Sequence, residues 1–414
     1  MTDERPPQKQ LAGRFAIREY IDDGGFATVF RAHDSKTDDE VAVKIPRNDV
    51  HADAEVTARF DREIRSLAGL QTAVIPTSIG RFIDGSTNQP RYIVTEYIDG
   101  ESLTKEMVTQ EVSPGMNTVI AFGFPVLRAL EFLHFNRYLY LDCKPKNILL
   151  RDEGGSVLID FNTVVRESAT EPADFYADPF KPPEQTPEAD AEHARTVGPW
   201  SDVYAAGKLL CYLLTDKTVP PADTPNAGID PRNLGSTCPV EVAVEVQRAT
   251  KADPDQRHDD AIALVDALLR VRNEPTATGV VTHRETGTVC PVRPGDTVGR
   301  VTDTASDTGV PALSIHDPER YVSPQHFRLY QEAGAWFIED TSLNGTFVRE
   351  GDEWTYLLSP DGYQRQHQHE NARAGDIEPP SALRIDGSRL ISPIDPGYSV
   401  TLEFDPTGVA ARRG

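Results

Sequence analysis

The stretch YLYLDCKPKNILL, Tyr138 to Leu150, decides how the larger part of this chain is interpreted. An otherwise apolar run is interrupted by an acid, two lysines and an amide, namely Asp142, Lys144, Lys146 and Asn147. Apolar residues on both sides predict buried strands, and they leave the polar groups together on the loop between them. Two interpretations are open: a loop that carries chemistry, or the remnant of one.

Length and charge limit the classes of protein to consider. The chain has 414 residues, enough for two or three domains, and 38% hydrophobic residues predict a real core. Its net charge of −23 argues against broad binding to nucleic acid or to anionic membranes, because such binding needs basic patches. An acidic chain with only ten lysines suggests either a halophile or a GC-rich genome, and full stability at low salt would count against the first.

The sequence also bears on the compartment. No apolar run approaches the roughly 20 residues that span a bilayer, and the polar start MTDERPPQKQ lacks the apolar stretch of a signal peptide. Four cysteines lie far apart without a C-x-x-C pair, so neither a zinc site nor a disulfide framework is expected. We therefore expect a soluble, cytoplasmic protein with reduced, buried thiols.

Hydrophobic patterning divides the chain into two folded parts. Residues 1–10 are predicted to be a tail, and over 11–273 early strands such as RYIVTEYI give way to helices such as the uniformly apolar SDVYAAGKLLCYLLT. One of these helices, marked by apolar residues from Val119 to Leu133, should bend at Pro125. Residues 274–288, rich in Thr and Gly, are predicted to be a linker. Short β-rich segments and turns predict an all-β sandwich over 289–405, followed by a tail at 406–414.

Five pieces that suit nucleotide binding follow one another in the first part. YIDDGGFATVF offers Gly24 and Gly25 between two strands, where backbone amides approach phosphates, although a plain hairpin turn has the same pattern. VAVK ends in Lys44, and Glu63 follows 19 residues later on a predicted helix. The opening stretch comes fourth, and VLIDFN places Asp160 just after a strand, where a carboxylate can bind Mg²⁺.

This ordered series resembles the protein-kinase signature set over residues 11–273. PPEQ (Pro182 to Gln185), SDVYAAG and DPDQRH are further matches. In the family, the position of Glu184 pairs with that of Arg257, and the position of Asp202 braces the catalytic loop. The resemblance implies a bilobal α+β kinase fold. Each motif alone is weak, whereas their common order and spacing are specific.

The resemblance assigns a role to each polar residue. Asp142 would accept the proton of a substrate hydroxyl, and Lys144 would contact the γ-phosphate. Asn147 and Asp160 would hold magnesium, and Pro145 after Lys144 favours the serine/threonine branch. The residues that would bind ATP are those of the glycine-rich loop, the ion pair and the hinge: Gly24, Gly25, Lys44, Glu63, Glu96 and Ile98.

Four departures from the family pattern leave two functions open. Leu141 replaces the arginine that reads an activation-segment phosphate, so a kinase of this non-RD type would not need that phosphorylation. Tyr140 replaces a histidine and should pack beneath Phe161. Asn162 replaces the glycine of D-F-G, and Ala177 replaces a threonine that contacts the catalytic residues. The complete polar set favours an active kinase using ATP and Mg²⁺, and the alternative is a pseudokinase adaptor.

The order G-R, S-x-x-H, N-G-T in DTVGR, YVSPQHF and DTSLNGTF resembles a forkhead-associated (FHA) domain, a β-sandwich that binds phosphothreonine peptides. Arg300 would contact the phosphate, Ser323 would add a neutral donor, and Asn344 would hold the peptide backbone. His326 is expected to brace the loops. Leu343 stands where a donor often helps, and the alternative is a sandwich that no longer binds phosphate.

Two further stretches carry weaker hypotheses. Residues 352–380 are predicted to be a solvated loop insertion, which we favour over a metal site at His367 and His369. Thr276 and Thr278 in the predicted linker are candidate autophosphorylation sites. The whole sequence predicts a serine/threonine kinase that acts on protein substrates and reads phosphothreonine in a partner or in itself.

Overall fold

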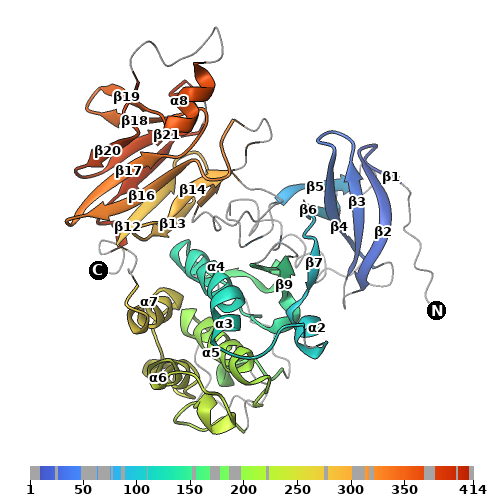
Figure 1. Cartoon of the computed structure of the whole chain (residues 1–414). Coiled ribbons are helices and arrows are strands. Elements are labelled where there is room, and N and C mark those ends of the chain that lie inside the picture. The colour runs from blue at the N-terminus through green and yellow to red at the C-terminus, as the bar shows by residue number, and fades with distance from the viewer. Residues whose placement is uncertain are drawn as a thin grey trace.

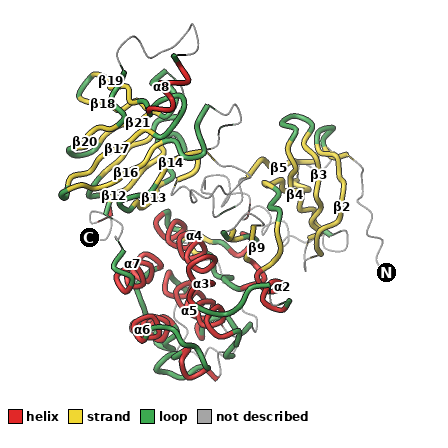
Figure 2. Tube along the Cα trace, in the orientation of Figure 1, coloured by secondary structure: helices red, strands yellow, loops and turns green. Residues whose placement is uncertain are grey.

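The computed structural model of the chain describes residues 10–23, 27–47, 63, 75, 78–84, 89–109, 111–151, 155–167, 178–185, 197–220, 223–274, 278–300, 313–315, 317, 321–367, 378–397 and 400–409. Within these residues, a strand-rich N-terminal lobe is followed by a helical lobe and a C-terminal sandwich (Figures 1 and 2). This is the predicted α+β arrangement of two lobes and a sandwich.

The N-terminal lobe is a six-stranded antiparallel sheet in the order β1-β2-β3-β4-β6-β5. Along β4, Val41 and Val43 face the lobe's own core, while Ala42 and Lys44 face a cavity. Because side chains alternate along a strand, packing of the two valines places Lys44 on the opposite side. The strands are β1 (Gln10–Leu11), β2 (Phe15–Asp23), β3 (Ala27–Asp34), β4 (Asp39–Pro46), β5 (Ser78–Asp84) and β6 (Gln89–Glu96).

The helical lobe is built around α5, in which the residues from Ser201 to Leu214 are all buried. The sequence prediction of a central helix is confirmed there, because an all-round apolar helix must be covered on every side. The helices are α2 (Leu103–Val108), α3 (Met116–Thr118), α4 (Phe124–Phe135), α5 (Pro199–Thr215), α6 (Val240–Ala249) and α7 (Ala261–Val271). The strands are β7 (Gly100–Ser102), β8 (Tyr138–Leu139), β9 (Ile148–Arg151), β10 (Ser156–Leu158) and β11 (Val165–Arg166).

Pro125 lies at the start of α4 and is accommodated without a break in the helical path. A π-helical turn, Val119–Gly123, joins α3 to α4. A proline has no backbone N–H to donate, and a widened turn is a common way to absorb this loss. Of the described helices, the run Met116–Phe135 is the one long and apolar enough to cross a membrane by length and composition, and 67% of that window is buried inside the protein.

The C-terminal part is a sandwich of two sheets, with strand orders β13-β12-β22-β21-β18-β19 and β15-β14-β16-β17-β20. Trp336 of one sheet meets Phe404 of the other edge-to-face, with ring centroids 5.2 Å apart. Its elements are β12 (Gly279–His283), β13 (Val289–Val292), β14 (Thr297–Arg300), β15 (Leu313–Ile315), β16 (Phe327–Glu332), β17 (Ala335–Asp340), β18 (Thr346–Glu350), β19 (Glu353–Leu357), α8 (Pro360–Gln366), β20 (Ala382–Ile385), β21 (Arg389–Ser392) and β22 (Leu402–Asp405).

Two segments predicted to be irregular have regular structure. The predicted linker at 274–288 contains β12, which pairs with β13 and with β22, so the sandwich begins at Gly279 rather than at residue 289. The strand forms because Val280 and Val281 are buried, which outweighs the Thr- and Gly-rich composition. The predicted insertion at 352–380 contains β19, which pairs with β18, and α8, whose first turn is capped by Ser359.

The sandwich packs directly on α4 and α7 of the helical lobe, as Figure 1 shows. The apolar contact joins Phe135 and Ile262 of that lobe to Val280, Val289 and Val409. Val409 belongs to the predicted tail at 406–414, and the described start of that tail is therefore part of the contact. Burial of apolar surface between the two parts favours one fixed arrangement.

Several hydrogen bonds join polar groups across the same contact. The guanidinium of Arg293 in the sandwich donates to Glu131 of α4 at 2.6 and 2.9 Å and to Asp266 of α7 at 3.3 Å. The Asn136 side chain donates to the Val289 carbonyl at 2.7 Å and accepts from the Val289 N–H at 2.9 Å. This arrangement favours one position of the sandwich, since a displaced Arg293 would withdraw its charge from two buried carboxylates.

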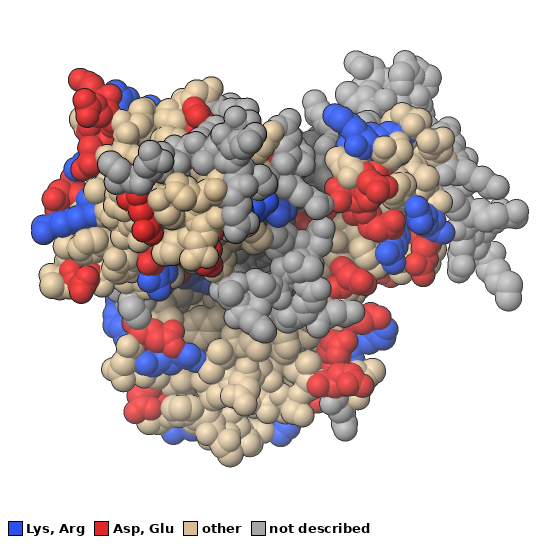
Figure 3. Space-filling view, turned by 45° about the horizontal axis from the view of Figure 1, so that its top comes forward, with Lys and Arg blue, Asp and Glu red and all other residues tan. Residues whose placement is uncertain are grey.

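The outer surface reflects the acidic composition. On the face drawn in Figure 3, acidic side chains gather on the N-terminal lobe and along the outer edge of the sandwich, with basic side chains between them. Interspersed charges of this kind favour solubility over broad binding to polyanions.

Candidate active site

A cavity of about 560 Å³ lies between the N-terminal lobe and the helical lobe. Its wall combines apolar residues of the sheet, such as Val29 and Ala42, with charged residues at its inner end. Of the predicted nucleotide-binding and metal-binding residues, those that line this cavity are Lys44, Glu63, Glu96, Ile98, Asn147 and Asp160. Gly24 and Gly25 lie outside the described residues.

One lysine and two carboxylates form the inner end of the cavity. The Lys44 ammonium donates to Glu63 at 2.9 and 3.1 Å and to the Asp160 Oδ1 oxygen at 2.9 Å. Burial disfavours the ammonium, but the charges of Asp160 and Glu63 outweigh burial and raise the pKa of Lys44. Burial likewise opposes ionisation of Asp160, yet Lys44 lowers the pKa of this carboxyl overall. Both groups are therefore charged at neutral pH.

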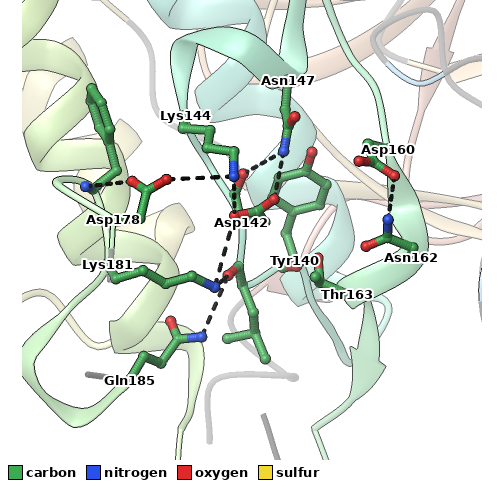
Figure 4. Close-up of polar contacts among 12 residues, drawn as sticks. Tyr140, Asp142, Lys144, Asn147, Asp160, Asn162, Thr163, Asp178, Lys181 and Gln185 are labelled. Atoms are coloured by element: carbon green, nitrogen blue, oxygen red, sulfur yellow. Dashed lines mark hydrogen bonds and ion pairs between the residues drawn. The ribbon is translucent and has the colours of Figure 1, made fainter. Parts of the chain in front are cut away.

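The opening stretch places a second polar cluster beside the cavity. The Asn147 side chain donates to the Asp142 Oδ2 oxygen at 2.8 Å, and the Lys144 ammonium lies 3.0 Å from Asp142 Oδ1 (Figure 4). A short 3-10 turn at Pro145–Asn147 brings these groups together before the chain enters β9. The predicted catalytic residues thus meet one another, and Asn147 connects them to the cavity wall.

The backbone of this loop is held from behind by Asp202 on α5. Its carboxylate accepts the N–H groups of Tyr140 at 2.8 Å and Leu141 at 2.7 Å, and it also contacts the His134 ring at 2.9 Å. Leu141 has a φ of +64°, an unfavourable value for a branched side chain, so these bonds stabilise a strained turn. The Tyr140 ring packs edge-to-face on Phe161, as the sequence predicted.

Asn162 has a contact that the sequence did not predict. Its amide donates to the Asp160 Oδ1 oxygen at 2.7 Å, the same oxygen that accepts from Lys44. Asp160 has a left-handed backbone, with φ of 65° and ψ of 77°, and the amide contact supports that conformation. A glycine at 162 could not make this bond. The departure from D-F-G therefore adds an anchor for Asp160.

The donors near Asp160 suit a magnesium ion. The amide nitrogen of Asn147 donates to Asp142, so the amide oxygen of Asn147 points away from Asp142. Asp160 supplies a carboxylate at the same cavity. Hard oxygen donors of this kind are the ligands that Mg²⁺ prefers. Among the described residues no cluster of three His, Cys, Asp or Glu side chains could hold a metal. Phosphate oxygens and water would complete the coordination of such an ion.

Two residues just before PPEQ, Asp178 and Lys181, also contact the loop that carries Asp142 and Lys144. Lys181 donates from its ammonium to the Leu141 carbonyl at 2.7 Å, and the Asp178 carboxylate lies 3.5 Å from the Lys144 ammonium. Ala177, whose replacement of threonine was the main departure at this position, lies outside the described residues. Asp178 and Lys181 were missed by sequence reasoning because they belong to no family motif.

Two other ion pairs fix elements around the cavity. Arg257, which is 1% exposed, donates to both carboxylate oxygens of Glu184 at 2.8 and 3.0 Å, the pairing that the resemblance implied. Glu96 is paired with Arg151 at 2.9 Å, so a contact from Glu96 to a nucleotide would come from its backbone. The Arg151 contact could not be read from the sequence, because the two residues are 55 positions apart.

The three predicted phosphate-reading residues of the sandwich lie on segments that hydrogen bonds join to one another. The Arg300 N–H donates to the Ser323 carbonyl at 2.9 Å, and Ser323 Oγ accepts from the Leu343 N–H at 3.4 Å. The Asn344 amide donates to the Tyr321 carbonyl at 2.6 Å. Three separate loops are thereby joined at one end of the sandwich.

A buried histidine supports these loops, as the sequence predicted. His326 accepts the Ser323 N–H at its Nδ1 atom and contacts the Gly345 carbonyl through Nε2, both at 3.0 Å. Burial lowers the pKa of His326 to about 4, so the ring is neutral. Gly345 has a φ of +87°, and a Cβ there would lie 2.3 Å from the Tyr356 ring. Only glycine fits this turn.

Comparison with known proteins agrees with this geometry. Residues 15–284 match the family described as protein kinase domain. The chain belongs to the protein kinase family. Residues 297–360 of this kinase chain match the family described as FHA domain.

The relatives of this kinase chain are named serine/threonine-protein kinases. A probable serine/threonine-protein kinase of Clostridium acetobutylicum is 27% identical over 280 residues, which are 64% of this chain and 40% of the relative. PrkC of Bacillus subtilis is 29% identical over 61% of this chain and 40% of its own length. PknL of Mycobacterium tuberculosis is 29% identical over 64% of this chain and 67% of its own length. The chain thus spans less than half the length of the first two.

A solved structure supports the kinase fold. The chain described as "PpkA-294 apo form" has a TM-score of 0.51 and 21% identity, and the match covers 64% of this chain and all of that chain. At this identity the likeness establishes the fold of the kinase domain alone.

Proposed function

We propose that this protein is an ATP- and magnesium-dependent serine/threonine protein kinase. One observation carries the proposal: the Lys44–Glu63–Asp160 cluster and the Asp142–Lys144–Asn147 cluster lie at the same cavity. An ammonium held by two carboxylates suits the phosphates of a nucleotide, and the nearby Asp142 carboxylate, oriented by Asn147 and Lys144, suits the hydroxyl of a protein substrate.

Each residue then has a defined task. Lys44, oriented by Glu63, would bind the nucleotide phosphates, and the carboxylate of Asp142 would orient the substrate hydroxyl and accept its proton. Lys144 would bind the phosphoryl group in transfer. A magnesium ion held by Asp160 and Asn147 would neutralise phosphate charge. Phosphoryl transfer depends mainly on this positioning and electrostatics.

We place the protein in the non-RD group of kinases. The Leu141 side chain is buried with Leu139, Val165 and Val197, at the position where other kinases have an arginine. An apolar side chain there cannot bind a phosphate, so activity should not require phosphorylation of the activation segment. The prediction is tested by treating the purified protein with a phosphatase before the assay.

The activity is tested with radiolabelled ATP, Mg²⁺ or Mn²⁺, and a generic acceptor protein. We expect transfer by the wild type and loss of about 100-fold or more in Asp142→Asn and Lys44→Ala. Lys105→Ala is the matched control, because Lys105 is exposed and pairs only with Glu101 in the described structure. Wild-type labelling no greater than that of the two site variants would contradict an enzyme.

A pseudokinase adaptor is the competing function, and the same assay separates the two. The departures at Leu141 and Asn162 favour it on sequence grounds, whereas the contacts of Lys181 and Asn162 with the loop and with Asp160 favour an active enzyme. Nucleotide binding without phosphoryl transfer would support the adaptor.

We further propose that the FHA domain binds phosphothreonine in protein partners or in this chain itself. The junction of Arg300, Ser323 and Asn344 at one end of the sandwich supports this role. Thr278 is exposed beside β13, which keeps it as a candidate site, and Thr276 lies outside the described residues. A phosphorylated partner bound here would be held near the kinase domain at raised effective concentration.

Peptide binding by the full chain tests the reader. A phosphothreonine peptide should bind more tightly than its unphosphorylated form, and Arg300→Ala should remove most of that preference. Arg384→Ala is the control, because Arg384 is an exposed arginine on β20 that pairs with Asp386. Equal affinity of the wild type for both peptides would overturn this role.

We also propose a cytoplasmic location, which the four free, buried cysteines support. Cell fractionation tests it, and recovery with membranes or in the medium would overturn it.

A further inference from the structure

The segment Asp178 to Gln185 forms a compact turn against the catalytic loop. The Asp178 carboxylate accepts the Phe180 N–H at 2.9 Å, and the Asp178 carbonyl accepts the Lys181 N–H at 3.1 Å. These two bonds turn the chain so that the Lys181 side chain extends towards the catalytic loop (Figure 4). Asp178 thus orients the side chain of Lys181.

Lys181 is buried, and its ammonium contacts the backbone of the catalytic loop. It is 3% exposed, and its Nζ atom donates to the Leu141 carbonyl at 2.7 Å and lies 3.8 Å from Asp142 Oδ1. Gln185 reaches the same carbonyl at 3.4 Å, a weaker contact. Burying an ammonium is costly unless partners surround it, so its position is specified by the loop that it contacts.

Both backbone polar groups of Leu141 are consequently held. Asp202 accepts the N–H of Leu141, and Lys181 binds the carbonyl of the same residue. Asp142 Oδ1 has two ammonium groups near it, that of Lys144 at 3.0 Å and that of Lys181 at 3.8 Å. Asp178, 3.5 Å from Lys144, extends this to a row of alternating charges, Asp178, Lys144, Asp142 and Lys181.

We propose that Lys181 is a positioning residue for the catalytic aspartate and that Asp178 orients it. Together they link the segment 178–185 to the catalytic loop without any phosphorylated residue. Leu141 cannot form such a link, because its side chain is apolar. The inference rests on the proposed kinase activity. It extends that activity by naming the groups that hold Asp142 ready without phosphorylation.

The contact predicts a specific kinetic effect. Lys181 is not part of the cavity wall, so its loss should leave nucleotide binding intact. Loss of the tether frees the Leu141–Asp142 peptide, and a displacement of about 1 Å at a reacting group can cost on the order of 100-fold in rate. The effect should therefore fall on kcat, with little change in the KM for ATP.

The test compares Lys181→Met, Lys181→Arg and Lys208→Met in the full chain. Lys208 is the matched control, because it is also 3% exposed and also donates to a backbone carbonyl, that of Val219, but on α5 away from the site. Peptide phosphorylation gives kcat and the KM for ATP, and urea unfolding reports the stability of each variant. All proteins are treated with phosphatase first.

We expect kcat to fall about 10- to 100-fold in Lys181→Met, to recover in part in Lys181→Arg, and to change less than threefold in Lys208→Met, with the KM for ATP constant. Equal kcat in Lys181→Met and Lys208→Met, with an active wild type, overturns this inference alone. A wild type that transfers no phosphate overturns it together with the proposed function. A wild type active only before phosphatase treatment also overturns the inference.

Discussion

At two places in this protein a cation lies between two carboxylates, but the surroundings of the two clusters differ. Lys44 lies between Glu63 and Asp160 at the cavity, with side chains 21%, 7% and 34% exposed. Arg293 lies between Glu131 and Asp266 where the sandwich meets the helical lobe, with side chains 6%, 1% and 3% exposed. The first cluster can therefore accept a ligand, whereas the second is sealed.

The difference teaches that exposure, rather than the charges themselves, separates a binding group from a structural one. At the cavity, water or a ligand can compensate a missing charge, so changes should reduce function more than stability. At the domain contact the two carboxylates are almost inaccessible to water, so solvent does not compensate the loss of Arg293, and changes should reduce stability more than function.

Arg293→Met should have the largest effect on stability. It removes the Arg293 charge from two buried carboxylates, Glu131 and Asp266, while Arg128 still lies 3.2 Å from Glu131, and we expect the free energy of unfolding to fall by about 3 kcal/mol. Urea unfolding measures the change. Arg384→Met, which removes an exposed pair with Asp386, should stay within about 0.5 kcal/mol. A loss below about 1 kcal/mol for Arg293→Met would mean that the contact is not sealed.

Lys44→Met should reduce activity strongly and stability only slightly. We expect phosphoryl transfer to fall about 100-fold or more, while the free energy of unfolding changes by about 1 kcal/mol or less, because solvent reaches the cavity. Saturating nucleotide with Mg²⁺ should raise the melting temperature of the wild type and of a folded Arg293→Met protein, and raise that of Lys44→Met much less. Equal shifts in the wild type and Lys44→Met would contradict the assigned contact with nucleotide.

Two buried titratable residues of the FHA domain, His326 and Asp340, extend the comparison to the effect of pH on stability. Burial lowers the pKa of His326 to about 4, so the unfolded chain takes up a proton near pH 6.5 and the folded chain does not. Stability contributed by neutral His326 is therefore lost as pH falls from 6.5 towards 4. Burial raises the pKa of Asp340 to about 6, although Thr346 and Ser342 donate to it, so its contribution rises as pH falls from 6 towards 4.

His326 and Asp340 should have opposite effects on stability as the pH falls, and single variants should separate the two contributions. Between pH 6.5 and pH 4, the free energy of unfolding of His326→Asn should rise by about 3 kcal/mol relative to that of the wild type, and that of Asp340→Asn should fall by about 2 kcal/mol relative to it. Urea unfolding at several pH values measures both changes. Parallel pH curves for all three proteins would show that neither group titrates in this range.

Much of the fold was predictable because the signals are local and repeated. Alternation along Asp39–Pro46 predicts a strand that turns Lys44 away from the core, and the apolar run at Pro199–Thr215 predicts a central helix. Strand β12 was missed because Gly279–His283 is short and lies within a Thr- and Gly-rich stretch, and its pairing with two neighbouring strands is a long-range contact.

The sequence by itself determined the family and most candidate residues, since motif order and spacing survive even where single positions change. Lys44, Glu63, Asp142, Asn147 and Asp160 could all be named from it. Tertiary structure alone decided what compensates for the altered positions. Lys181 reaches Leu141 across 40 residues, and Arg293 reaches Glu131 across 162. Such pairs belong to no local pattern, because their energy comes from burial and charge that exist only once the chain has folded.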